Sequence, residues 1–178
     1  CGLNFFAFQS FNGWVSTYLK EIHHFDADDV GKLLTILHVG SMVGAIAWGL
    51  AADRLGRRFN ALGFVLAGAL IVVYLLTPGV WWALAAAGFA YGFCLVCSGV
   101  WGPYFAELYP DHLRATAASI FNWGRIVSLF GALLSGAVAQ HYGLQAAMYL
   151  GAATFVGAAL LWWSLPETLR RAGPEPAR

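Results

Sequence analysis

The sequence predicts an all-α integral membrane protein, built as a bundle of six transmembrane helices. Of its 178 residues, 60% are hydrophobic and 11% are charged, against about 25% charged residues in an ordinary soluble domain. Lys, Arg, Asp and Glu are absent from 59–106 and again from 126–166. A membrane-spanning helix needs about 20 apolar residues, so each of these runs holds two spans joined by a turn.

The order of the spans follows from where charged and turn-forming residues lie. The polar segment Lys20–Lys32 ends the first span, and the charged loop Asp53–Arg58 ends the second. Gly and Pro at 77–79 and Gly at 141–143 predict tight turns after the third and fifth spans, and the polar segment 107–114 separates the fourth from the fifth. The expected spans are 1–19, 33–52, 59–76, 80–106, 115–140 and 144–165.

Basic residues are distributed unequally between the two sides of this bundle. Short loops rich in Lys and Arg remain in the cytoplasm. One side carries seven basic residues: Arg54, Arg57, Arg58, Arg114, Arg170, Arg171 and Arg178. The other side carries Lys20 and Lys32 beside several acids. We therefore expect a multi-pass protein of the cell (inner or plasma) membrane, with the Arg-rich loops and the C-terminus in the cytoplasm. Its surroundings are the lipid bilayer, and no nucleic-acid partner is expected.

The two ends of the chain suggest part of a longer protein. The chain begins at Cys1, inside an apolar stretch, without Met and without a signal-peptide pattern. We expect a transmembrane bundle at 1–165 followed by a polar, Pro-rich cytoplasmic tail at 166–178. A C-terminal half is the favoured interpretation, and a complete six-helix protein or an N-terminal half are the alternatives.

The loop after the second span carries a defined pattern of Gly, Asp and Arg. Residues 49–58 read G-L-A-A-D-R-L-G-R-R. Gly49 would let a neighbouring helix approach closely, and Gly56 permits a tight turn. The carboxylate of Asp53 would meet positive partial charge near the start of the next helix. The remaining side chains offer paired donors to acids on other loops: Arg54, Arg57 and Arg58. A simple positive anchor would leave the Asp and both Gly unexplained.

Two more segments on the same side have a recognisable pattern. Residues 107–116 read E-L-Y-P-D-H-L-R-A-T, and residues 166–169 read P-E-T-L. With the loop 49–58, they resemble, in order, the motifs of the major facilitator superfamily, above all its sugar, organic-ion and metabolite carriers. Asp111 stands where these carriers usually have Thr, and Ala117 where Gly is frequent; neither difference removes a charge from the pattern. The resemblance covers essentially the whole chain.

The resemblance implies both a fold and a mode of action. The chain would be one half of a 12-helix fold, a 3+3 inverted repeat, with the missing N-terminal six-helix half as its partner. Its function would be secondary active transport by alternating access, without a cofactor, and not enzymatic catalysis. Glu107, Arg114 and Glu167 would join the loop Arg residues in a network that latches the cytoplasmic side. As exposed pairs, these contacts would each contribute about 0–1 kcal/mol.

Arg125 is the one basic residue inside a predicted span. With Ala115 at the start of the span and a rise of 1.5 Å per residue, it lies about 15 Å deep, near the middle of the bilayer. Burial there costs at least about 2.5–3.5 kcal/mol, so we expect Arg125 and the nearby Asn122 to bind an anionic substrate. A structural Arg paired with the missing half is the alternative. Residues 122–125, N-W-G-R, also resemble the N-x-G-R segment of carriers for sialate and aromatic acids.

Three other residues complete the candidate substrate site. Gln9 and Asn12 share one face of the first span, where they could contact substrate or form helix–helix hydrogen bonds. Trp101 is a further candidate contact in the fourth span. Gly102 and Pro103 follow it and predict a bend there, either a hinge or a static kink.

Proton and metal chemistry have few candidate residues. No Asp or Glu lies within a predicted span, so proton coupling would depend on His38 or on the missing half. A neutral His38 bonded to a carbonyl is the alternative. Cys94 and Cys97 have the spacing of metal ligands but no further ligands nearby, so no metal site is expected. Neither H-E-x-x-H nor G-x-S-x-G occurs, which argues against an intramembrane enzyme.

The expected function is therefore transport of a small organic anion, a carboxylate, coupled to protons. A carrier of neutral sugars or polyols is the alternative, because the cytoplasmic motifs are shared and Arg125 alone favours an anion.

Overall fold

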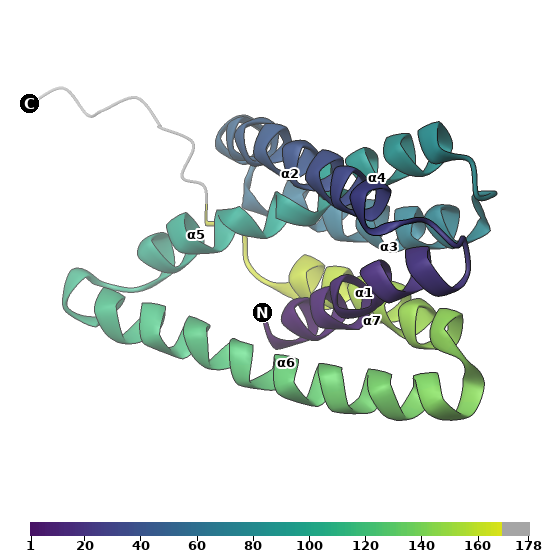
Figure 1. Ribbon diagram of the computed structural model, residues 1–178. Helices are drawn as coiled ribbons and strands as arrows, with labels where there is room; N and C mark the ends of the chain where they lie inside the picture. The colour runs from purple at the N-terminus through teal and green to yellow at the C-terminus, as the bar shows by residue number, and fades with distance from the viewer. Residues whose placement is uncertain (169–178) are drawn as a thin grey trace, which may run out of the picture.

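The computed structural model describes residues 1–168, and within that range it leaves out the side chains of Asp111, Ala118, Ile120 and Phe121. Every regular element of the described chain is a helix (Figure 1). The elements are α1 (Gly2–Glu21), α2 (Ala27–Leu55), η1 (Arg57–Asn60), α3 (Ala61–Leu76), α4 (Trp81–Leu95), η2 (Val96–Val100), α5 (Trp101–Leu108), η3 (Asp111–Leu113), α6 (Arg114–Tyr142) and α7 (Leu144–Ser164).

These elements form six long helical segments, in agreement with the prediction. Five are long and apolar enough to cross a membrane: Ala27–Leu55, Arg57–Leu76, Trp81–Leu108, Arg114–Tyr142 and Leu144–Ser164. The remaining segment, α1, is helical over 20 residues. Its lower hydropathy follows from the polar side chains that it turns toward the other helices. The tail residues 169–178, including three of the Arg residues used to predict orientation, lie outside the described residues.

The second helix is longer than predicted at both ends. It begins at Ala27 and not at Leu33, because Asp26 caps its N-terminus: the Asp26 Oδ1 accepts a hydrogen bond from the Asp29 backbone N–H at 2.8 Å. It ends at Leu55 and not at Ala52, so Asp53 belongs to its last turn. Polarity in these stretches therefore marks where the helix leaves the apolar layer and not where it stops.

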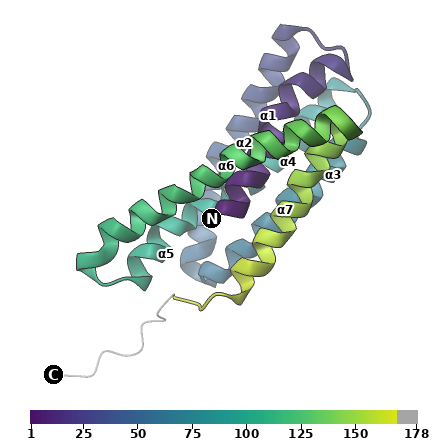
Figure 2. The same cartoon turned by 90° about the horizontal axis from the view of Figure 1, so that it is seen from below.

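The helices pack in pairs around a shared core. α2 packs along α4, α3 packs along α7, and α1 contacts both α6 and α7. Figure 1 shows α6 along one side of the bundle, and Figure 2 shows α5 and the start of α6 projecting beyond the other helices at one end. The α2–α4 pair is especially close: a Cβ at Gly44 would lie 2.2 Å from the Phe93 carbonyl oxygen, so only glycine fits there.

The fourth segment is broken near its middle. The α-helix α4 gives way to the 3-10 stretch η2 just before Trp101, which lies close to the bend expected from Pro103. Two side-chain donors hold backbone carbonyls at this break. Trp48 Nε1 donates to the Phe93 carbonyl at 2.9 Å, and Asn60 Nδ2 donates to the Cys97 carbonyl at 2.8 Å. Helices α2 and η1 therefore fix the geometry of the break.

Candidate functional site

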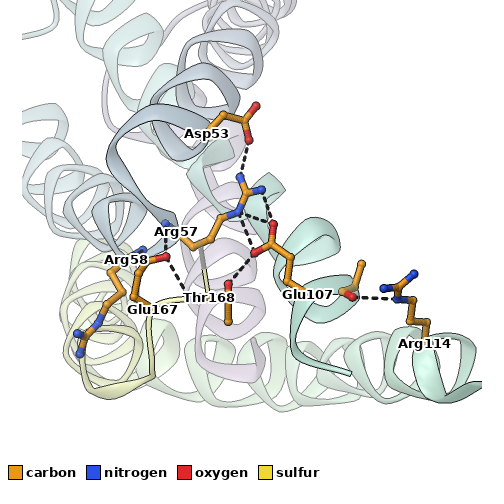
Figure 3. Close-up of polar contacts among 8 residues, drawn as sticks. Asp53, Arg57, Arg58, Glu107, Arg114, Glu167 and Thr168 are labelled. Atoms are coloured by element: carbon orange, nitrogen blue, oxygen red, sulfur yellow. Dashed lines mark hydrogen bonds and ion pairs between the residues drawn. The ribbon is translucent and has the colours of Figure 1, made fainter. Parts of the chain in front are cut away.

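A cluster of charged side chains lies at the end of the bundle where α2, α5 and α7 finish (Figure 3). Arg57 is its centre. Its Nη1 lies 2.6 Å from Asp53 Oδ1, and its Nη2 lies 2.6 Å from Glu107 Oε1. Its Nε also donates to both Glu107 oxygens, at 3.2 and 3.3 Å. One guanidinium therefore joins two carboxylates from different helices.

Burial distinguishes the members of this cluster. The Arg57 side chain is 8% exposed, and that of Glu107 is 30% exposed. The Asp53 side chain is 65% exposed. The assumption that all these pairs are solvent-exposed is thus wrong for Arg57–Glu107. The Arg57–Glu107 contact is expected to be stronger than Asp53–Arg57 because it is less screened.

The turn between α2 and η1 positions Arg57. Gly56 has φ of +106°, a conformation that L side chains rarely adopt. The Glu167 carboxylate then accepts hydrogen bonds from the backbone N–H groups of Arg57 and Arg58, both at 2.9 Å. A Cβ at position 56 would lie 2.7 Å from Glu167 Oε2. Glu167 therefore acts on the start of η1, where a carboxylate is favoured.

The segment after α7 is tied to the cluster by more than Glu167. The Thr168 hydroxyl donates to Glu107 Oε2 at 2.7 Å, and the Tyr104 hydroxyl donates to the Pro166 carbonyl at 3.1 Å. Trp162 Nε1 donates to the Arg57 carbonyl at 3.1 Å. Thr168 was not among the predicted site residues, although the P-E-T motif contains it. These bonds join the end of α7 to α5 and η1.

Other predicted members of the network have different surroundings. Arg58 donates to the Trp163 carbonyl. Arg114 Nε donates to the Ala106 carbonyl at 2.9 Å, at the end of α5. Arg54 is exposed and forms no ion pair with a described residue. A Cβ at Gly49 would meet no atom within 4 Å, so the close helix approach expected there does not occur within the described part of the chain.

A second feature is a cavity of about 440 Å³ between α1, the α4–η2 junction and α6. Its lining residues are Asn4, Phe5, Phe8, Gln9, Leu95, Val96, Ser98, Arg125 and Ser128. Two of the predicted substrate residues, Gln9 and Arg125, are among them. The guanidinium carbon of Arg125 lies 5.7 Å from the centroid of the Phe5 ring, within the range of a cation–π contact.

The remaining candidate substrate residues do not line this cavity. Asn12 Nδ2 donates to the Tyr91 hydroxyl at 3.1 Å, which is the helix–helix hydrogen bond considered as its alternative role. Trp101 is 2% exposed and packs against Phe64 and Trp162, so the structure places it in the core. Its large apolar surface explains that burial. Asn122 lies on an exposed part of α6, outside the cavity lining.

His38 and the cysteines also differ from a catalytic or metal-binding arrangement. His38 is exposed on α2, and its Nδ1 lies 2.6 Å from the Leu34 carbonyl oxygen. The carbonyl contact agrees with the alternative considered for this residue. Cys94 and Cys97 are free and buried. Among the described residues, no three His, Cys, Asp or Glu side chains come together as a metal site.

Comparison with known proteins identifies the family. Residues 1–178 match the family described as the Major Facilitator Superfamily. The chain belongs to this superfamily. It is thus a multi-pass membrane protein of a transporter family, and the expectation of a transporter fold and not an enzyme is confirmed.

Individual relatives agree with this assignment. The chain is 35% identical to a putative metabolite transport protein of Haemophilus influenzae, over 80% of this chain and 36% of that protein. It is 27% identical to the cis,cis-muconate transport protein of Acinetobacter baylyi, over 85% of this chain and 37% of the relative. The chain therefore spans little more than a third of the length of these relatives.

A solved structure confirms the fold. The chain resembles the nucleoside transporter NupG with a TM-score of 0.70 and 16% identity, over 98% of this chain and 46% of that structure. The predicted six-helix half of a larger transporter fold is thereby confirmed.

Proposed function

We propose that the full-length protein is a secondary active transporter of a small organic anion, and that Arg125 binds the substrate carboxylate. The observation that carries this proposal is the composition of the cavity. Among its nine lining residues, Arg125 is the one ionisable side chain, and the others are apolar or neutral polar. A guanidinium in such surroundings favours a carboxylate, with which it can form two parallel hydrogen bonds.

The similarity to a cis,cis-muconate transport protein supports the same substrate class. Muconate is a carboxylate anion, and it is the substrate named for the relative and not for this chain. We propose proton coupling as well, with the proton site in the part of the full-length protein that this chain does not include, because the described cavity contains no acid. His38 has a weaker claim, since its ring already contacts a carbonyl.

The contacts of the Arg57 cluster support the proposal that this cluster acts as a gate on one side of the membrane. We place the Arg57 cluster on the cytoplasmic side, where basic loops are retained. There the contacts of Arg57 with Asp53 and Glu107, and the Glu167 cap on η1, would hold that side closed. Opening would then require these contacts to separate, which a carrier must do once in each transport cycle.

Substitution of Arg125 tests the substrate proposal. Arg125→Ala should weaken anion binding by about 2–5 kcal/mol, the cost of removing one partner of a charge pair that the bound substrate shields from water, which is about 30-fold to several thousand-fold in affinity. Arg125→Lys should fail nearly as badly, because Lys lacks the planar donor fork. The matched control is Ser119→Ala, also on α6, whose hydroxyl bonds to the Ala115 carbonyl outside the cavity.

The measurement is binding of cis,cis-muconate and of glucose to purified full-length variants, with melting temperatures on the same samples. Normal muconate affinity in Arg125→Ala would overturn the anion site. Glucose binding without muconate binding would establish the neutral-sugar carrier in its place.

A further inference from the structure

The cavity beside Arg125 contains a buried amide with no internal partner. Asn4 lines the cavity from α1, and it is 4% exposed. Its Oδ1 is buried and accepts no hydrogen bond from any described residue. An unsatisfied buried polar atom is costly, so each such atom requires an explanation.

The other buried polar residues show how unusual Asn4 is. Among the residues that the structure describes, five polar or charged residues are buried: Asn4, Ser10, Arg57, Asn60 and Ser135. Ser10 donates to the Phe6 carbonyl, and Ser135 accepts a hydrogen bond from Trp14 Nε1. Arg57 and Asn60 also form side-chain hydrogen bonds. Asn60 also leaves its Oδ1 without a described partner, but its Nδ2 is bonded. Of these five residues, Asn4 alone makes no side-chain hydrogen bond within the described chain, so packing among the described helices does not explain its polarity.

From this we propose that Asn4 is a specificity-determining residue that accepts a hydrogen bond from a hydroxyl group of the transported anion. This inference rests on the proposed anion transport and specifies its substrate as a hydroxylated carboxylate. Arg125 binds the carboxylate from α6, and Asn4 binds the hydroxyl from α1. The Asn amide turns about a soft terminal torsion, which brings its oxygen to a group in the cavity.

The rest of the cavity wall fits such a molecule. Phe5 and Phe8 add apolar surface to the cavity wall, and Phe5 already contacts the Arg125 guanidinium. A cavity of about 440 Å³ is large enough for a carboxylate attached to a six-membered ring. A site built to bind a hydroxyl rejects the analogue without it, because the buried oxygen of Asn4 then stays unpaired.

The test compares matched acids that differ by one hydroxyl group. The first pair is 4-hydroxybenzoate and benzoate, with the hydroxyl far from the carboxylate. The second is mandelate and phenylacetate, with the hydroxyl next to it. Wild-type full-length protein should prefer the hydroxylated member of at least one pair by about fivefold or more. Asn4→Leu should reduce that preference to about twofold or less and leave affinity for the hydroxyl-free acid within about twofold of wild type.

Control variants separate recognition from folding. Ser10→Ala changes another buried polar residue of α1 whose bond is internal, and it should retain the hydroxyl preference. Asn4→Leu should melt no lower than wild type, because it removes an unsatisfied polar atom. If Asn4→Leu cannot be purified, Asn4→Ala gives the same comparison with a smaller side chain.

Each remaining outcome has a defined meaning. A hydroxyl preference that persists in both Asn4 variants, or a wild type that binds the acids without preference, overturns the role of Asn4 and leaves anion transport intact. Wild-type protein that binds none of the four acids, or binds them equally well with Arg125→Ala, overturns the anion site and the Asn4 inference with it.

Discussion

Neutralising Glu107 should weaken the Arg57 cluster far more than neutralising Asp53. Glu107→Gln removes the charge that faces the Arg57 guanidinium at 2.6 Å in a partly buried contact. Hydrogen bonds to charged groups contribute about 1.5–3 kcal/mol, so the closed arrangement should lose about 10- to 150-fold in population. Asp53 is 65% exposed, and an exposed pair contributes about 0–1 kcal/mol, or at most about fivefold.

The assay is labelling of a cysteine placed beside the cluster. Gly99 lines a cavity of about 310 Å³ together with Asp53 and Arg57. A Cβ at Gly99 meets no atom within 4 Å, so Gly99→Cys should fit without distortion. The parent protein should lack its native thiols at Cys1, Cys94 and Cys97. Gly99 is exposed in this chain, so the assay uses the full-length protein, in which the labelling rate of this thiol should report how often the cytoplasmic side opens.

The comparison between the Glu107 and Asp53 variants tests whether the more buried carboxylate contributes more to the closed arrangement. Glu107→Gln should speed labelling markedly, and Asp53→Asn should change it little, with both variants folded by their melting temperatures. Equal rates in the two variants would refute the burial argument. Rates unchanged from the parent in both would show that the cluster does not hold this end closed.

Two other perturbations test the turn at Gly56 and the loop after α1. Gly56→Ala should destabilise the protein by about 1–3 kcal/mol, because residue 56 has a φ of +106° and the new Cβ would displace the Glu167 carboxylate. Gly31→Ala is the matched control in helix α2, where a Cβ meets no atom within 4 Å, and it should stabilise the protein by about 0.5–1 kcal/mol. Equal melting temperatures for the two variants would contradict this account. Burial, and secondarily His24, lowers the pKa of His23, whose ring contacts the Tyr18 hydroxyl. The folded state therefore favours neutral His23, and its stabilisation is complete above the ordinary pKa of about 6.5 and lost as pH falls through the lowered value. His23→Gln should flatten the acid side of a plot of melting temperature against pH, and an unchanged slope would show that another group titrates there.

The number and order of the spans were predictable because membrane helices depend on composition. The charge-free run 59–106 already contains two of the spans, and the run 126–166 contains the last span and the second half of the one before it. Helix ends were less predictable, because they depend on individual hydrogen bonds. The N-terminus of α2 is set by the Asp26 cap, and three charged residues in the first turns, Asp28, Asp29 and Lys32, conceal the helix from a hydropathy pattern.

The charged residue of the candidate substrate site could be predicted from the sequence, and its neutral residues could not. Arg125 is conspicuous in sequence because a charge in a span has a large cost. From the sequence alone, Trp101 and Asn12 could not be distinguished from residues that line the cavity. Burial and hydrogen bonding depend on which helices pack against each other. Asn4 was visible as a polar residue of the first span, but its missing partner is a property of the folded bundle.

The break in the fourth segment connects the two sites physically. On one face of the α4–η2 junction, Val96 and Ser98 line the cavity that contains Arg125. On another, Asn60 holds the Cys97 carbonyl, and Asn60 ends the short helix η1 that begins with Arg57. Glu107, the main partner of Arg57, lies at the end of α5, which continues directly from η2. In the proposed transport cycle, a substrate that shifted the cavity wall at Val96 would act on a segment that is bonded to η1 through Cys97 and to Arg57 through Glu107. Two states of this one segment would be enough to couple binding to opening, without a longer chain of contacts.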